Sequence, residues 1–162
     1  MRTDVSGADV GMDWIHHLIH HGRMFFANYR VAAAATARIV GIKVGSKAVH
    51  LAFELKAGAG TPISFKEGVT ITVDGSALAR RNRNRNFKDD STETTLFTGS
   101  TYTGGTDIAP DQAGFGSNPG LLSVGEVRST EEIVLKPNTQ YAIEFTPSAS
   151  TDTVLKLSFY EV

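Results

Sequence analysis

The sequence predicts an all-β protein, an antiparallel β-sandwich or jelly roll of about eight to nine strands with an N-terminal arm or short helix. Three observations lead to this class. Apolar and polar residues alternate in several short runs, turn-forming residues separate those runs, and only one segment has a helical pattern. The chain has 162 residues, which fits one domain with a sizeable core.

Residues 1–23 are expected to form an arm outside the sandwich. Residues 1–12 are small and polar and are typical of a tail, and the stretch DWIHHLIHHG follows them with a possible N-cap at Asp13 and a possible stop at Gly22. Ten residues make a marginal helix alone, so an arm that becomes ordered against a neighbour is an equal alternative. A helix would place four apolar side chains on one face: Trp14, Ile15, Leu18 and Ile19.

Residues 24–162 are expected to form the sandwich, because period-two alternation recurs throughout this range. The clearest strands, with their inward residues, are ARIVGIKV (Val40, Ile42, Val44), VHLAFELK (Val49, Leu51, Phe53, Leu55), VTITVDG (Val69, Ile71, Val73), QYAIEFTP (Tyr141, Ile143, Phe145) and TVLKLSFYE (Leu155, Leu157, Phe159). Further candidates are RMFFANYRV, ISFKEG, ETTLFTG and EEIVLKP.

Predicted turns lie between these strands, at AGAGTP, DGS, TGGTD, GFGSNPG, KPNTQ and PSASTD. The longest weakly patterned stretch is residues 104–126, where Gly and Pro argue against regular structure. Loops of this length in compact domains are usually functional or mobile.

Composition narrows the classes of function. The formal net charge of −1 is unlike the broad basic excess of nucleic-acid-binding proteins. Without cysteine there are no disulfides or thiolate metal sites. No run of about 18 apolar residues could span a membrane, and the N-terminus lacks the apolar core of a signal peptide. We therefore expect synthesis and retention in a cytoplasm, unless the protein leaves within a larger assembly.

Four histidines in HHLIHH form two pairs with the i, i+4 spacing of helical metal ligands, His16 with His20 and His17 with His21. A structural site would need further ligands, such as Asp13 or His50, and the pattern does not require them. The metalloprotease glutamate is missing from the cluster. We interpret the histidines as interface or surface residues and predict no metal site and no cofactor.

The stretch ARRNRNRNFKDD places four arginines within six residues: Arg80, Arg81, Arg83 and Arg85. Phosphate binding is one interpretation, but no aromatic residue is interleaved for base stacking. Arginine also pairs with carboxylates, and asparagine stabilises turns. We favour a structural or docking loop, with Arg83 and Arg85 paired to carboxylates of the same subunit, the next subunit or a larger shell.

Catalysis has little support in the sequence. GFGSNPG has the wrong spacing for a nucleophile elbow, and no phosphate-binding loop of the Walker type is present. The acidic pairs Glu131–Glu132 and Asp89–Asp90 are adjacent, so on strands they would face opposite ways, and we interpret them as solvated charges. We predict no catalytic residues and no enzymatic activity.

Six stretches, in order from about residue 15 to residue 161, resemble a family of tailed-bacteriophage virion proteins: HHLIHHGRMFF, ISFKEG, RRNRNRN, TYTGGTDI, IVLKPNTQYAIEF and LSFYE. The resemblance implies a structural role, and most closely that of a capsid decoration (cement) protein on the outside of the phage head. Many such proteins are β-sandwiches that bind as oligomers and clamp neighbouring capsid subunits.

The expected partners are the major capsid protein and further copies of the chain, with a trimer favoured over a dimer. No membrane and no specific nucleic acid is expected as a partner. Interface candidates are residues 1–12 and the residues Trp14, His16, His17, His20, His21, Arg80, Arg81, Arg83 and Arg85. The alternatives are a tail, baseplate or head-fibre structural protein, or a carbohydrate-binding module for host attachment.

Overall fold

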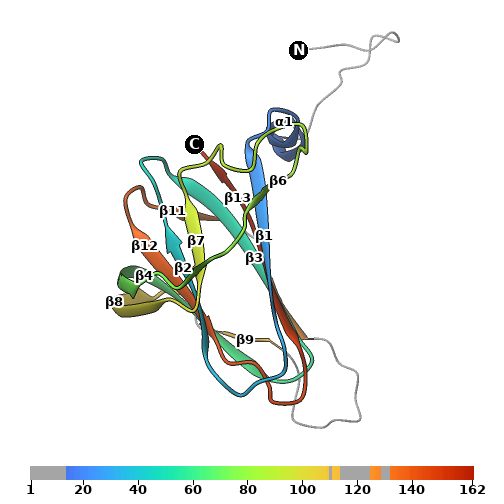
Figure 1. Ribbon diagram of the computed structural model, residues 1–162, viewed down its shortest axis with the longest axis vertical. Coiled ribbons are helices and arrows are strands. Elements are labelled where there is room, and N and C mark those ends of the chain that lie inside the picture. Colours follow the sequence, from blue (N-terminus) through green and yellow to red (C-terminus); the bar gives the residue numbers. More distant parts are fainter. Residues whose placement is uncertain (1–13, 110, 114–124, 129–131) are drawn as a thin grey trace.

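The computed structural model describes residues 14–109, 111–113, 125–128 and 132–162. In this part of the chain a single short helix accompanies thirteen strands in two antiparallel sheets that pack face to face (Figure 1). Two of these strands have only two residues. The all-β sandwich is confirmed, with eleven longer strands where eight to nine were expected.

The first sheet contains six strands in the order β10-β3-β13-β1-β6, with β11 also paired to β3. Their bounds are β1 (Met24–Val31), β3 (Val49–Ala57), β6 (Arg81–Asn82), β10 (Gly125–Arg128), β11 (Ile133–Leu135) and β13 (Thr153–Glu161). The long central pairs β1–β13 and β13–β3 run antiparallel, with Phe25 opposite Phe159 and Leu157 opposite Phe53.

The second sheet contains seven strands in the order β5-β7-β2-β12-β4-β8, with β9 also paired to β4. Their bounds are β2 (Arg38–Lys43), β4 (Thr61–Val73), β5 (Ser76–Ala77), β7 (Thr95–Thr98), β8 (Thr101–Asp107), β9 (Asp111–Ala113) and β12 (Gln140–Phe145).

The core lies between the sheets and is built from the inward faces that the alternation predicts. Strand β3 alternates buried and half-buried residues along its whole length. The Phe53 ring meets the Phe65 ring of the opposite sheet edge-on, with centroids 5.7 Å apart. Phe65 in turn stacks on Tyr141. Each such large side chain contributes about 1.5–3 kcal/mol of burial free energy.

Two predictions about the second sheet are corrected. ISFKEG and the first five residues of VTITVDG belong to one strand, β4. Of the three expected inward residues only Val69 is buried: Ile71 is half-buried, and Val73, which follows a register shift, is 58% exposed. TGGTD is not a turn but part of β8, paired to β4. Gly104 and Gly105 have positive φ there. Glycine is common in turns because it adopts positive φ without strain, and here the same property is used inside a strand.

The other predicted turns connect strands as expected, apart from GFGSNPG, which lies outside the described residues. No helix in the described ranges is long and apolar enough to cross a membrane.

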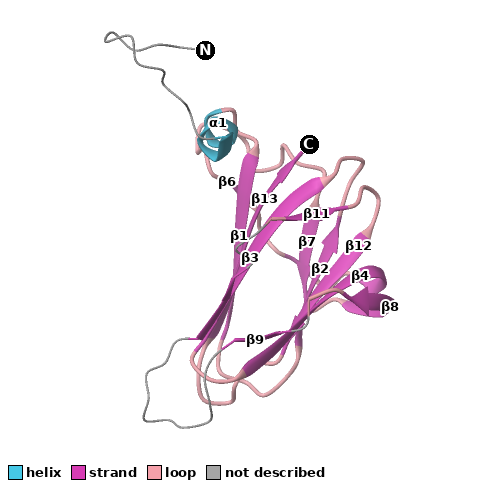
Figure 2. Ribbon diagram, turned by 180° about the vertical axis from the view of Figure 1, so that it is seen from behind, coloured by secondary structure: helices cyan, strands magenta, loops and turns pink. Residues whose placement is uncertain are grey.

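Helix α1 (Trp14–His20) lies at the end of the sandwich where the chain also terminates (Figure 2). It stops at Gly22 as predicted. Gly22 has φ 66°, its N–H donates to the Ile19 carbonyl, and the Arg23 N–H donates to the Leu18 carbonyl. This pair of bonds is the Schellman arrangement that ends many helices. Asp13 lies outside the described residues.

The apolar face of α1 packs on the first sheet. Leu18 is buried with Met24 and Tyr160, and Ile15 and Ile19 pack against this cluster, which is separate from the main core. Trp14 was expected on this face but is 56% exposed.

Candidate functional site

The Asn/Arg loop, residues 80–86, lies directly beside α1 (Figure 1). Asn82 is fully buried. Its Nδ2 donates to the Gly22 carbonyl at 2.7 Å, and its Oδ1 accepts from the Asn84 N–H at 2.9 Å. Asn84 Nδ2 donates to the His20 carbonyl at 3.1 Å. The asparagines therefore provide hydrogen-bond partners for the carbonyl of His20, the last residue of α1, and for that of Gly22 in the turn that follows.

The arginines of the loop have other partners. Arg81 and Arg85 both pair with Asp89, at 2.8 and 2.6 Å. Asp89 also accepts the Asn82 N–H at 2.8 Å. The hydrogen bonds from Arg85, from Arg81 and from this N–H hold the pKa of the Asp89 carboxyl well below its usual range. Asp89 is thus a structural anchor rather than a solvated charge.

The expected carboxylate partner is confirmed for Arg85, but none is found for Arg83 among the described residues. Arg83 donates instead to the Ser158 hydroxyl on β13 at 2.6 Å. Its backbone N–H donates to the Met24 carbonyl, which fixes the start of the side chain. Arg80 donates to the Thr92 carbonyl at 3.3 Å, and its buried Nε has no partner among the described residues.

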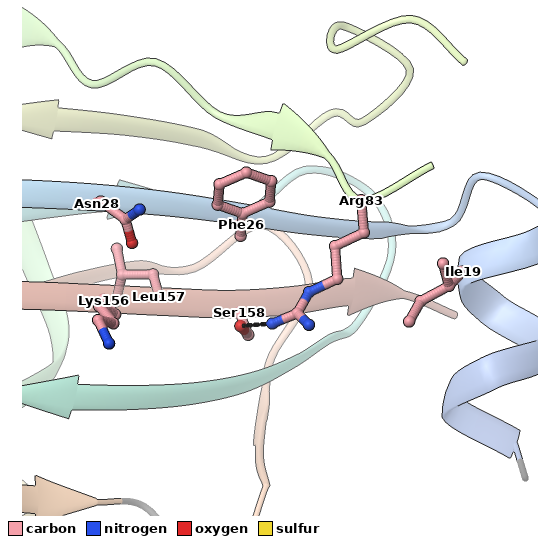
Figure 3. Close-up of a pocket in the computed structure, with 7 residues that line it drawn as sticks. All are labelled: Ile19, Phe26, Asn28, Arg83, Lys156, Leu157 and Ser158. Atoms are coloured by element: carbon pink, nitrogen blue, oxygen red, sulfur yellow. Dashed lines mark hydrogen bonds between the residues drawn. The ribbon is translucent and has the colours of Figure 1, made fainter. Parts of the chain in front are cut away.

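Arg83 forms one wall of a hollow on the outer face of the first sheet (Figure 3). The hollow has a volume of about 430 Å³. Strands β1 and β13 form the floor of the hollow, and α1 closes one end. Its lining includes both apolar and polar side chains. The lining residues are Ile19, Phe26, Asn28, Arg83, Lys156, Leu157 and Ser158.

The two cations of this hollow differ in their partners. Lys156 Nζ lies 3.0 Å from the Glu54 carboxylate. Arg83 meets only the neutral Ser158 hydroxyl among the described side chains. A guanidinium has five N–H donors in a planar fork that suits a carboxylate. Arg83 is therefore the group in this hollow best suited to bind a carboxylate from another molecule.

The histidines of α1 lie on the exposed side of the helix. His16 Nε2 and His20 Nε2 are 2.8 Å apart. His17 stacks on His21 with ring centroids 4.0 Å apart, and Trp14 also stacks on His17, with centroids 5.5 Å apart. No group of three or more His, Asp or Glu side chains that could hold a metal is found in the described part of the chain.

His50, a possible further ligand from the sequence, belongs to a different cluster. Its Nδ1 lies 2.9 Å from both the Glu132 carboxylate and the Tyr160 hydroxyl, and Tyr160 donates to Glu132 at 2.8 Å. Burial, and then the neighbouring Glu132, raise the pKa of Tyr160. Glu132 is exposed, as expected of a solvated charge, and it also pairs with His50 and Tyr160 of the first sheet.

Glu161 near the C-terminus fixes the chain that leaves the Asn/Arg loop. One of its oxygens accepts hydrogen bonds from the Thr92 hydroxyl, the Thr94 hydroxyl and the Thr94 N–H, at 2.5, 2.8 and 2.8 Å. Both threonines are buried. The terminal Tyr-Glu of LSFYE therefore has two separate structural roles, which sequence spacing does not reveal because the partners are 28 to 110 residues away.

The structure thus brings most of the sequence-predicted interface residues to one end of the molecule. The α1 histidines, Trp14 and the Asn/Arg loop are neighbours there, joined by hydrogen bonds through Asn82 and Asn84. Residues 1–12 lie outside the described residues. No protein-family model matches the chain, and no curated protein matches it either.

Proposed function

We propose that the protein is a structural protein of a tailed-bacteriophage virion, a decoration protein that binds the outside of the head and stabilises the capsid lattice. In this proposal its partners are the major capsid protein and further copies of itself, with a trimer favoured over a dimer. It has no catalytic role. The ordered sequence resemblance suggests the virion, and the all-β sandwich is compatible with it.

The observation that carries the docking part of the proposal is Arg83. Its backbone is fixed by Met24 and its guanidinium meets only a hydroxyl within the described part of the chain. Fixing a cation before binding reduces the entropy that an interface must overcome. Repetition over a symmetric shell then adds avidity, so that each copy needs only a modest affinity.

Co-sedimentation tests the proposal. Purified protein is mixed with phage heads stripped of it and, separately, with isolated tails. Saturable binding to expanded heads, with none to tails, is the expected result. Binding to tails alone would assign the fold to a tail or baseplate protein. Binding to neither, together with binding on a glycan array, would favour a carbohydrate-binding module instead.

A further inference from the structure

The four histidines around α1 form two pairs with identical sequence spacing and different geometry. The His16 and His20 rings are tilted by 42°, and a hydrogen bond of 2.8 Å joins their Nε2 atoms. The His17 and His21 rings are nearly parallel, at 26°. The two pairs are therefore equivalent in sequence spacing but differ in ring geometry.

The stacked pair is poorly arranged to share an ion. The lone pair of an imidazole nitrogen lies in the plane of the ring, so near-parallel stacked rings direct their lone pairs side by side rather than at one point. In addition, His21 Nδ1 donates to the His17 carbonyl at 2.9 Å, and Trp14 also stacks on His17. These contacts restrict how either ring can turn.

The hydrogen bond holds the two Nε2 atoms of the tilted pair at a separation that also suits two adjacent metal ligands, and an ion that binds both nitrogens displaces the proton between them. With metal–nitrogen distances of about 2.0–2.1 Å, two imidazoles at right angles lie about 2.9 Å apart, and two in a tetrahedral site about 3.3 Å apart. The observed 2.8 Å is closer to the right-angled case, which square-planar and octahedral ions adopt. Both rings are exposed, so a small rotation can direct both lone pairs at one ion.

We propose that His16 and His20 bind a divalent transition-metal ion of the Cu²⁺ or Ni²⁺ type, with water in the remaining positions. Cu²⁺ binds most tightly, as the general order of affinities for nitrogen ligands requires. The ion bridges two successive turns of a seven-residue helix. Because a helix of this length is marginal without tertiary contacts, the bridge stabilises α1 on the first sheet. The proposal is independent of any role in a virion.

The test uses untagged protein and Cu²⁺ alone. Pulsed electron paramagnetic resonance should show one Cu²⁺ per chain with two imidazole nitrogens, and the ion should raise the midpoint of thermal unfolding. The double variant His16→Ala/His20→Ala should lose both effects. The matched control His17→Ala/His21→Ala has the same spacing and the same number of removed rings, and should keep both.

Circular dichroism establishes that each variant is folded before metal is added, and His16→Gln/His20→Gln serves if the alanine variant is not folded. Equal loss in the two double variants would overturn the proposal, because it would show diffuse binding by the whole cluster. Retention of the signal in both variants, or a wild-type protein that binds no Cu²⁺ through two imidazoles, would overturn it as well.

Discussion

Asn82 shows how a single uncharged residue organises the arginine-rich loop. It is fully buried, and its side chain bonds both the end of α1 and its own loop. The sequence draws attention to the arginines, since they carry charge. The sequence does not single out Asn82, because only this asparagine of the loop is buried, whereas Asn84 is half-buried and Asn86 is exposed.

Replacing Asn82 with alanine should lower the free energy of unfolding by about 2–3 kcal/mol, because the buried Gly22 carbonyl and Asn84 N–H would lose their partner. Urea unfolding measures this change. Asn86→Ala is the matched control, since Asn86 is exposed, and it should cost about 0.5 kcal/mol or less. Equal effects of the two substitutions would contradict the proposed anchoring role.

Asp89 makes the loop sensitive to acid. Its folded pKa is lowered by Arg85, Arg81 and the Asn82 N–H, so its ionised form stabilises the protein above the unfolded value of about 3.9. This stabilisation disappears as the pH falls further toward the folded pKa. Asp89→Asn should therefore be less stable than the wild type at pH 7, and the difference should shrink at about pH 2.5. An unchanged difference at both pH values in urea unfolding would contradict this account.

At the scale of elements, strands that bury one face could be predicted from the sequence, whereas a strand that contains glycines with positive φ could not. Period-two alternation encodes which side of β3, β12 and β13 faces the core, and the structure confirms it. Strand β8 was missed, because Gly-Gly is typical of turns and the sequence contains no information about the partner strand β4. The His50–Tyr160–Glu132 cluster was missed for a related reason, since it depends on strand register.

Helix α1 is a local unit, because its apolar cluster is separate from the main core. Leu18→Ala should free the helix and leave the sandwich folded. Hydrogen exchange should then show lost protection in α1, with only a small shift of the global unfolding midpoint.

Leu51→Ala is the control for this experiment. Leu51 is as buried as Leu18 but belongs to the main core, so its loss should cost about 2–5 kcal/mol of global stability. If Leu18→Ala lowered the global stability as much as Leu51→Ala, the helix would not be a separate unit.

At the scale of the whole molecule, the outer face of the first sheet carries one arginine proposed to bind a partner and another that is paired within the chain. Arg83 and Arg30 both lie on this side, and Arg30 pairs with Asp152 at 2.6 Å. Arg83→Ala should weaken attachment to stripped heads about tenfold or more, as expected for loss of a charged interface contact. Arg30→Ala should leave attachment unchanged, and co-sedimentation with stripped heads compares the two variants. Equal attachment of both variants would remove Arg83 from the docking surface.

Strand β8 has a consequence for how the molecule associates through its sheet edges. It ends the second sheet, and an exposed sheet edge is a template for edge-to-edge aggregation. A Cβ at Gly105 would lie 2.5 Å from Val69 Cγ1, and Gly104 and Gly105 both have positive φ. These glycines break the regular row of N–H and C=O groups along the strand. The β8 edge is therefore a poor template for pairing with a strand of another molecule.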